Sequence, residues 1–414
     1  MSNTTLTADV LAKIALPILE NELGVINKMY RAHEEEFSST VNGYKKGDTI
    51  SIRRPADFTL RTGPNTSSQD VIEGKTTLTI DQQIGVDFSF TSSDLTLKVE
   101  DMATRIIKPA MSTIANGMAL DCLTQMYRGV YNYVGTPGQR VDSFADFTKA
   151  PERLDELAAP SDGRSAILCP NDFWGMVGSN TALFSPATVE KALRNGDLGN
   201  IGGIDMLMSQ VVPTHTVGAL GGTPLVNGAS QSVTYDAVKN TWSQSLVTDG
   251  WANSVTGVLK AGDVFTIAGV YMVNAKTKAV TNILQQFVVG ADANSGAATG
   301  PATLTISPPI IVAGAYQTVN AAPADNAPIT MVGSAATNYR QNMAFHKNAM
   351  ALAVVPMEMP QAAYGGSRQS YKGLSVRLIP GYNHATDVSS WRMDLLYGRK
   401  LLDPRVATRF AGTA

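Results

Sequence analysis

Histidine and cysteine, the side chains best suited to metal binding and nucleophilic catalysis, are few and widely separated in this sequence. The four histidines are His33, His215, His346 and His384, and the two cysteines are Cys122 and Cys169. A zinc-protease helix needs a second histidine four residues after the first, but Phe37 stands there after His33 and Glu34. Both cysteines lie among apolar residues, which is typical of buried thiols rather than of a disulfide framework. The pattern predicts no metal site.

Motifs for nucleotide binding and for hydrolysis are also missing. The sequence contains neither a G-x-S-x-G motif nor a Walker phosphate-binding loop. Gly199, Gly202 and Gly203 are spaced G-x-x-G-G, which differs from the dinucleotide-binding pattern and predicts a tight turn. A Ser–His–Asp triad is defined by geometry, so the sequence leaves that alternative open. We expect His215 to be structural, and we expect no catalytic residues and no cofactor.

The composition narrows the class of protein. Of the 414 residues, 44% are hydrophobic and 16% are charged, and the net charge is −2. A near-neutral chain is not a nucleic-acid binder through its overall charge. No stretch approaches the roughly 20 apolar residues of a membrane span, and no secretory signal is evident at the N-terminus. We therefore expect a protein of the reducing cytoplasm that has no membrane partner.

The first part of the sequence contains two stretches that predict long helices, which would position any functional residues. Residues 8–37 predict a helix, with a broad apolar band from Val10 to Ile26 that is interrupted at Pro17. The stretch 92–134 opens on Ser92, Ser93 and Asp94, which are helix-start residues. Its apolar residues recur at helical spacing: Val99, Met102, Ile106, Ala110, Ile114, Met118, Cys122, Met126 and Val130. Pro109 either kinks this helix or begins a second one, and the part from Pro109 to Val134 would be roughly 39 Å long.

Between these helices, residues 44–90 alternate in the manner of extended strands around a long polar tip. Alternation is clear at 49–52, 76–80 and 86–90. The tip carries basic side chains at Arg53, Arg54 and Arg61. A long two-stranded hairpin cannot bury itself, so it is either mobile or lies on another molecule. These three arginines are therefore candidate contact residues.

The composition changes sharply in the second half of the chain. No arginine occurs between Arg194 and Arg340, and in residues 222–336 helix formers are scarce and β-formers are frequent. This predicts an inserted all-β module, a small barrel with strands at 264–267, 284–289 and 303–306. A polar excursion at 236–256 holds two tryptophans, each of which is either core or contact anchor. Its candidate contact residues are Asp236, Lys239, Trp242, Asp249 and Trp251.

Around this module, the remaining segments predict a mixed helix and strand region. Residues 144–157, 171–177 and 185–194 predict helices, and residues 165–168 predict a strand. After the insertion, residues 350–355, 374–380 and 389–397 predict further strands, and Trp391, Met393, Leu395 and Tyr397 share one face.

This ordered set resembles the coat proteins of tailed double-stranded DNA phages, specifically the phage P22 coat type. Residues 259–270 (LKAGDVFTIAGV), 284–289 and 304–308 are similar to strands and a turn of that family's inserted domain, and 107–111 with 120–123 to its spine helix. Residues 391–398 are similar to its terminal strand. The resemblance implies an α+β protein with the HK97-type coat fold, which has a long spine helix, an extended hairpin (E-loop) and an inserted all-β barrel domain.

Carried onto this sequence, the resemblance implies seven segments. They are an N-terminal arm (1–43), the extended hairpin (44–90), the spine helix of the peripheral domain (91–140), the first part of the axial domain (141–221), the inserted barrel (222–336), the second part of the axial domain (337–380) and the C-terminal strand of the peripheral domain (381–414). In the family, the polar excursion of the barrel bridges neighbouring capsomers, which here implies Asp236, Lys239 and Asp249.

The implied function is that of a major capsid protein, which self-assembles into the icosahedral shell around the double-stranded DNA genome of a tailed bacteriophage. The implied partners are further copies in pentamers and hexamers, a scaffolding protein, a portal, and packaged DNA held by non-specific contact. The implied location is the virion, after assembly in the host bacterial cytoplasm. Two alternatives stay open: another phage structural subunit, such as a tail protein or surface adhesin, and an enzyme of mixed fold.

Overall fold

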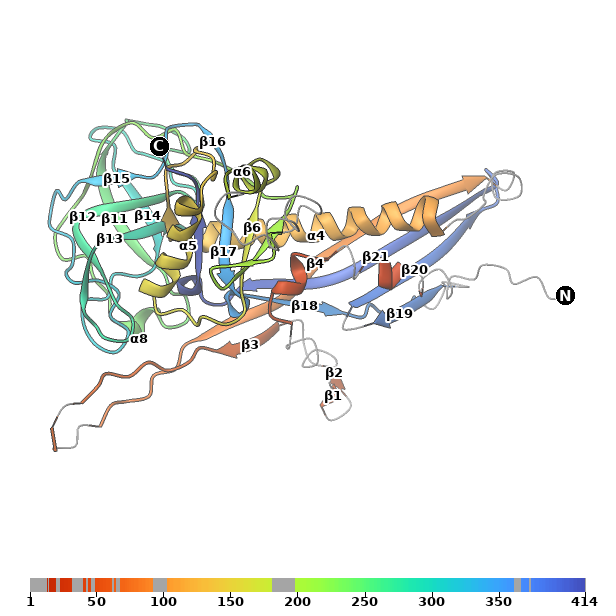
Figure 1. The fold of residues 1–414 in the computed structure, drawn as a ribbon, viewed down its shortest axis with the longest axis horizontal. Coiled ribbons are helices and arrows are strands. Elements are labelled where there is room, and N and C mark those ends of the chain that lie inside the picture. The colour runs from red at the N-terminus through yellow and green to blue at the C-terminus, as the bar shows by residue number, and fades with distance from the viewer. Residues whose placement is uncertain are drawn as a thin grey trace. The chain divides into compact units, whose positions relative to one another are not determined.

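The computed structural model of the chain divides into two compact units (Figure 1). Unit 1 comprises Met1–Ser51, Thr77–Cys122 and Met350–Lys400, and unit 2 comprises Ile52–Thr76, Leu123–Ala349 and Leu401–Ala414. The structure describes residues 13, 15–19, 23–31, 40–41, 44–45, 49–61, 63–64, 68–91, 103–180, 198–360, 366–371 and 374–413.

Unit 1 is built on an antiparallel sheet. Its order is β19 (Ser367–Tyr371), β20 (Leu374–Asn383), β21 (Val388–Leu401), β4 (Lys75–Thr91) and β3 (Thr49–Arg53), and β18 (Met350–Val355) also pairs with β21. The predicted alternation in β21 is confirmed, because Met393, Leu395 and Tyr397 are buried on one face. The stretches 76–80 and 86–90 lie within the single strand β4.

The predicted long helix is present in the described residues but ends earlier than expected. A π-helical turn, η2 (Ala103–Ile107), leads into helix α4 (Lys108–Gly129), so Pro109 is the second residue of the α-helix. Its apolar stripe is buried at Met111, Ile114, Met118, Cys122 and Met126. The expected continuation to Val134 is wrong, because Tyr133–Val134 forms strand β5 and pairs in parallel with the C-terminal strand. At 1.5 Å per residue, α4 is about 33 Å long. The predicted helix start at 92–94 lies outside the described residues.

The N-terminal helix is shorter than predicted. Residues 15–19 are helical, and the chain then forms the 3₁₀ turn η1 (Ile26–Lys28) and a single bridge from Tyr30 to Ala351. The expectation of a helix through residue 37 is therefore wrong from residue 23 to residue 31, and residues 32–37 lie outside the described part. Short strands β1 (Thr40–Val41) and β2 (Tyr44–Lys45) pair with each other.

Unit 2 contains a mixed sheet packed against helices α5 (Phe144–Glu156) and α6 (Pro170–Asn180). The strand order is β5, β22 (Ala407–Phe410), β17 (Asn342–His346), β6 (Arg164–Leu168), β8 (Ile204–Met208) and β7 (Asn200–Ile201). Strand β6 and both helices confirm their predictions, whereas the helix expected at 185–194 lies outside the described residues. Gly202 and Gly203 have positive φ in the turn between β7 and β8, as the predicted turn requires. Short connecting elements are β9 (Thr214–Thr216), β16 (Asn338–Arg340), η3 (Lys347–Ala349) and η4 (Pro404–Val406).

The second part of unit 2 is the predicted barrel. Its strand order is β10 (Gly222–Val226), β11 (Gln244–Trp251), β14 (Ala302–Ser307), β13 (Val280–Val289), β12 (Val264–Val273) and β15 (Ile329–Met331). The sheet closes on itself, because Leu225 bridges to Pro328 and the Val226 N–H donates to the Ala327 carbonyl at 3.0 Å. The strands predicted at 264–267, 284–289 and 303–306 are confirmed.

Residues 236–256 do not form the polar excursion that the sequence predicted. This stretch contains the short helix α8 (Tyr235–Val238) and strand β11, which lies between β10 and β14. Side chains of β11 alternate between outside and core, with Leu246, Thr248 and Trp251 buried. The segment is a structural strand of the barrel because its inward residues fill the core.

None of the helices in the described ranges combines the length and apolarity needed to span a membrane.

Candidate functional site

The segment that joins β3 to β4 folds as a hairpin whose outer part is held by one side chain. The Gln69 Oε1 accepts hydrogen bonds from the Thr59 N–H at 2.9 Å and from the Thr59 hydroxyl at 3.0 Å. The Gln69 amide nitrogen donates to the Thr59 carbonyl at 2.7 Å. We call residues 54–57 and 72–75 the hairpin base. Residues 54–57 are its outgoing chain, which leads to the tip of the hairpin, and residues 72–75 are its returning chain. The base is where this hairpin meets the rest of unit 2.

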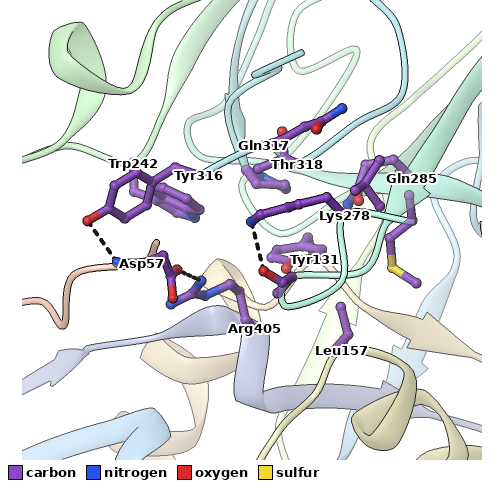
Figure 2. A pocket seen from close by; sticks show the side chains of 14 residues that line it. Asp57, Tyr131, Leu157, Trp242, Lys278, Gln285, Tyr316, Gln317, Thr318 and Arg405 are labelled. Atoms are coloured by element: carbon purple, nitrogen blue, oxygen red, sulfur yellow. Dashed lines mark hydrogen bonds and ion pairs between the residues drawn. The ribbon is translucent and has the colours of Figure 1, made fainter. Parts of the chain in front are cut away.

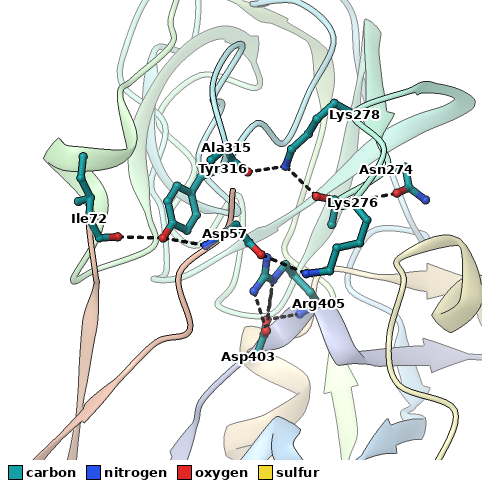
Figure 3. Close-up of polar contacts among 10 residues, drawn as sticks. Asp57, Ile72, Asn274, Lys276, Lys278, Ala315, Tyr316, Asp403 and Arg405 are labelled. Carbon is teal, nitrogen blue, oxygen red and sulfur yellow. Dashed lines mark hydrogen bonds and ion pairs between the residues drawn. The ribbon is translucent and has the colours of Figure 1, made fainter. Parts of the chain in front are cut away.

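One tyrosine of the barrel contacts both chains of the hairpin base. The Tyr316 hydroxyl donates to the Ile72 carbonyl at 2.8 Å and accepts from the Asp57 N–H at 3.2 Å (Figure 3). Its ring stacks on Tyr235, with ring centroids 3.4 Å apart and planes at 7°. Burial raises the pKa of Tyr235 to about 12. The hydroxyl of Tyr316 therefore acts as a bridge from the barrel to the hairpin.

Charged side chains surround the Asp57 carboxylate. Arg405 Nη1 donates to one oxygen at 3.0 Å and Lys276 Nζ lies 3.2 Å from the other (Figure 3). Arg405 also donates through Nε and Nη2 to the Asp403 carboxylate, with each nitrogen 3.0 Å from its acceptor oxygen. Burial alone would raise the pKa of Asp403, but the charge and hydrogen bonds of Arg405 hold that pKa below its usual value. The network links the hairpin base, the β12–β13 turn and the C-terminal segment.

A tryptophan completes the contact surface under the hairpin base. Trp242 is buried, and the guanidinium groups of Arg54 and Arg405 lie 5.5 Å and 5.8 Å from its ring centroid. This is cation–π distance. Burial lowers the pKa of Arg54. Gly74 packs so closely on the end of α8 that an added Cβ would lie 2.2 Å from the Lys239 carbonyl oxygen.

The space enclosed by this network is too small for a substrate. Its cavity is about 30 Å³, lined among others by Asp57, Trp242, Lys278 and Arg405 (Figure 2). Sites for small molecules are typically 300–1,000 Å³. Lys278 points toward backbone carbonyls and donates to Ala275 at 2.7 Å, and burial lowers its pKa against the opposing charge of Asp57. The arrangement holds backbone segments together and offers no room for chemistry on a ligand.

A second buried polar group contains His215. Its Nε2 lies 2.7 Å from the Asp263 Oδ1, and the other Asp263 oxygen accepts from the N–H groups of Lys260 at 2.7 Å and Gly218 at 3.1 Å. These bonds order the turn before β12, and the structural role predicted for His215 is confirmed. Among the described residues, no three His, Cys, Asp or Glu side chains gather in a group that could hold a metal ion.

The contact residues proposed from the sequence fall in several places. Arg54 and Trp242, which come from different predicted segments, meet at the hairpin base. Arg53 pairs with Glu73 at 3.1 Å, and Asp236 pairs with Lys239 at 2.7 Å.

The other proposed contact residues do not join this site. Arg61 donates to the Gly63 carbonyl at 2.5 Å in the outer hairpin, and Asp249 lies half-buried on β11. Trp251 is part of the barrel core, so for both tryptophans the core alternative is the one that the structure supports. Sequence reasoning missed Asp57, Tyr316 and Arg405, which carry no local pattern.

Comparison with known proteins finds coat proteins of phages. The family model described as "P22 coat protein - gene protein 5" matches residues 20–412. The major capsid protein of Acyrthosiphon pisum secondary endosymbiont phage 1 is 22% identical over 380 residues, which cover 88% of this chain and 89% of that protein.

Among solved structures, one from Mycobacterium phage Che8 is 13% identical and covers 93% of this chain and 89% of its own, with a TM-score of 0.47. The CUS-3 coat protein I-domain is 27% identical, covers 27% of this chain and 96% of its own, and has a TM-score of 0.20.

A family match over nearly the whole length defines the class as viral coat proteins. The chain belongs to the P22 coat protein family. The predicted α+β architecture is confirmed, with a long helix, an extended hairpin and an inserted barrel. The predicted function of a phage major capsid protein is also confirmed over the tail-subunit alternative. The family is one of structural proteins.

Proposed function

We propose that this coat protein builds its shell by laying the hairpin of residues 54–74 on a neighbouring copy. The observation that carries the proposal is the exposure of large apolar side chains on the hairpin. Leu60 is 92% exposed, Val71 62% and Phe58 56%. Exposed apolar groups that cluster on one projecting segment are typical of surfaces that another protein covers.

The energetics suit a shell that corrects its errors. Burying each of these side chains would contribute roughly 1.5–3 kcal/mol. Contacts of this size are individually reversible, and the stability of a closed shell comes from their repetition in many symmetric copies. Arg61, exposed on the hairpin, and Arg53, exposed at the end of β3, would add charge contacts at the rim of the interface.

We assign the remaining functional details to the same proposal. The copies form pentamers and hexamers, assemble with a scaffolding protein and a portal in the host cytoplasm, and enclose packaged DNA by non-specific contact. The seven segments expected from the sequence are retained as the domain assignment. Asp236, Lys239 and Asp249 on the barrel are the proposed contacts between capsomers. The proposal gives the chain no catalytic role.

A matched pair of valine substitutions tests the role of the hairpin. Val71→Asp places a charge on the hairpin, and Val280→Asp places the same charge on the barrel, where Val280 is 57% exposed. We expect the first variant to remain a folded subunit by circular dichroism but to form few or no particles by electron microscopy. We expect the second to assemble normally. Normal particles from Val71→Asp would reject the proposal.

A further inference from the structure

We propose that the inserted barrel is the platform that fixes the direction in which the hairpin leaves the subunit. This inference rests on the proposed function of the hairpin, and it adds a positioning role for Tyr316, Lys276 and the end of α8. The hairpin base is held by elements far away in the sequence. Three contacts carry the argument, and the first two act on different groups of Asp57.

The first contact is the hydroxyl of Tyr316, which joins both chains of the hairpin base to one point on the barrel. It bonds to Asp57 on the outgoing chain and to Ile72 on the returning chain. A single bond to one chain would let the hairpin rotate about that chain. Two bonds from one rigid, stacked ring fix both chains, so the ring of Tyr316 defines the plane of the hairpin base.

The second contact is ionic and acts on the same residue from another side. The Asp57 carboxylate engages Lys276 of the barrel through one oxygen and Arg405 through the other. The Asp57 side chain is largely buried, with 11% exposed, so these contacts are screened less than those of an exposed pair. Asp57 therefore holds the outgoing chain between the barrel and the C-terminal segment.

The third contact is a close approach of the two backbones. Gly74 lies against the Lys239 carbonyl at a distance that excludes a Cβ atom. The N–H of Lys75 donates to the Asn240 side chain at 3.1 Å, and the N–H of Arg54 donates to the Gly74 carbonyl at 2.8 Å. The returning chain thus packs against the turn that follows α8. The guanidinium of Arg54 lies over the ring of Trp242 in the same place.

Together these contacts make the barrel the element that holds the hairpin base within its own subunit. Outer hairpin residues such as Leu60 can meet a neighbour only if the base holds the hairpin at one angle. A change in the barrel at Tyr316 would therefore alter the hairpin without touching any residue that contacts a neighbour.

Tyr316→Phe in the full-length, unassembled subunit tests this inference. The change removes the bridging hydroxyl and keeps the ring that stacks on Tyr235. We expect amide hydrogen exchange in the peptide that contains Asp57 to become roughly three- to tenfold faster, the equivalent of one lost hydrogen bond. Exchange in the barrel strands should not change. Tyr271→Phe, on the exposed side of β12, is the control and should alter neither region.

Two results would overturn the inference. One is unchanged exchange at the hairpin base in Tyr316→Phe. The other is an equal acceleration in the barrel strands, which would mean that Tyr316 only stabilises the barrel. A second pair of variants checks the ionic contact: Asp57→Asn should loosen the base, and Asp57→Glu, which keeps a carboxylate, should restore protection. Equal exchange in these two variants would contradict the role of the Asp57 charge.

Assembly of the same variants separates this inference from the proposed function. Aberrant or missing particles from a variant with a loosened base support both. Normal particles from such a variant would contradict the role of the hairpin in the shell, while the exchange data would still establish that the barrel holds it.

Discussion

The side chain of Gln286 takes the place of a neighbouring strand for Tyr133. Its Oε1 accepts from the Tyr133 N–H at 2.7 Å, and its amide nitrogen donates to the Tyr133 carbonyl at 2.8 Å. Tyr133 lies on β5, the edge strand of the mixed sheet, and Gln286 lies on β13 of the barrel. One side chain therefore satisfies the edge of one sheet from the other part of unit 2.

Replacing Gln286 with alanine should weaken unit 2. The change leaves the Tyr133 N–H and carbonyl without their partner, and we expect the free energy of unfolding to fall by about 1–3 kcal/mol. Urea unfolding followed by fluorescence measures this loss. Asn282→Ala, at an exposed position of the same strand, is the control and should change stability by less than about 0.5 kcal/mol. Equal stabilities of the two variants would contradict the account of the edge.

Two glycine substitutions should have opposite signs. Gly74→Ala places a Cβ 2.2 Å from the Lys239 carbonyl and 2.8 Å from the Tyr235 hydroxyl, so the hairpin base must shift. Gly117→Ala lies inside α4, where a Cβ meets nothing within 4 Å. We expect the second change to raise the free energy of unfolding by about 1 kcal/mol through helix propensity. Thermal melting compares them, and a stabilising Gly74→Ala would show that the base is loosely packed.

Asp394 in unit 1 should make stability depend on acid pH. Its carboxylate is 3% exposed and accepts from Arg377 at 2.6 Å and Arg392 at 2.8 Å. Burial alone would raise the pKa of Asp394, but these hydrogen bonds hold the pKa below its usual value. The resulting stability is therefore present at neutral pH and lost as pH falls below about 4, toward the folded-state pKa.

Asp394→Asn tests that pH dependence. At pH 7 the change leaves the largely buried Arg377 without a counter-charge, and we expect a loss of about 3 kcal/mol in the free energy of unfolding. The difference between the two proteins should shrink as urea unfolding is repeated at progressively lower pH. An equal difference at pH 7 and at about pH 3 would contradict the assigned cause.

Strands in which apolar and polar residues alternate regularly were predictable from the sequence, and strands with weak alternation were not. The alternation of Met393, Leu395 and Tyr397 predicts β21 because each side faces a different environment. Strand β11 was missed because a threonine occupies one of its inward positions. Thr248 is buried there because its hydroxyl accepts from the Trp251 indole at 2.9 Å and donates to the Ala302 carbonyl at 2.8 Å.

The candidate site was predictable only in part. Arg54 and Trp242 were chosen separately, as a basic and an aromatic residue in polar stretches, and the fold brings them together. Asp57 and Arg405 are 348 residues apart, and neither belongs to a motif. A contact that exists only after folding leaves no local spacing to recognise. The same holds for Tyr316, whose hydroxyl joins two chains that the sequence separates from it by more than 200 residues.

The turn before β12 should depend on a single carboxylate. Asp263→Ala removes the acceptor for the Lys260 and Gly218 N–H groups and the partner of His215. Because these groups are largely buried, we expect the free energy of unfolding to fall by about 3 kcal/mol. Urea unfolding measures it, with Asp249→Ala on the half-exposed side of β11 as the control. A loss in Asp263→Ala no larger than in the control would contradict the structural role given to this turn.

Hydroxyl-radical footprinting of Phe58, Leu60 and Val71 in the free subunit and in assembled particles tests the central claim most directly. All three side chains are exposed in the single chain, so they should react readily there. If a neighbouring copy covers the hairpin, their oxidation in particles should fall several-fold, while Val280 on the barrel reacts at a similar rate in both states. Equal oxidation of the three hairpin residues before and after assembly would contradict the account.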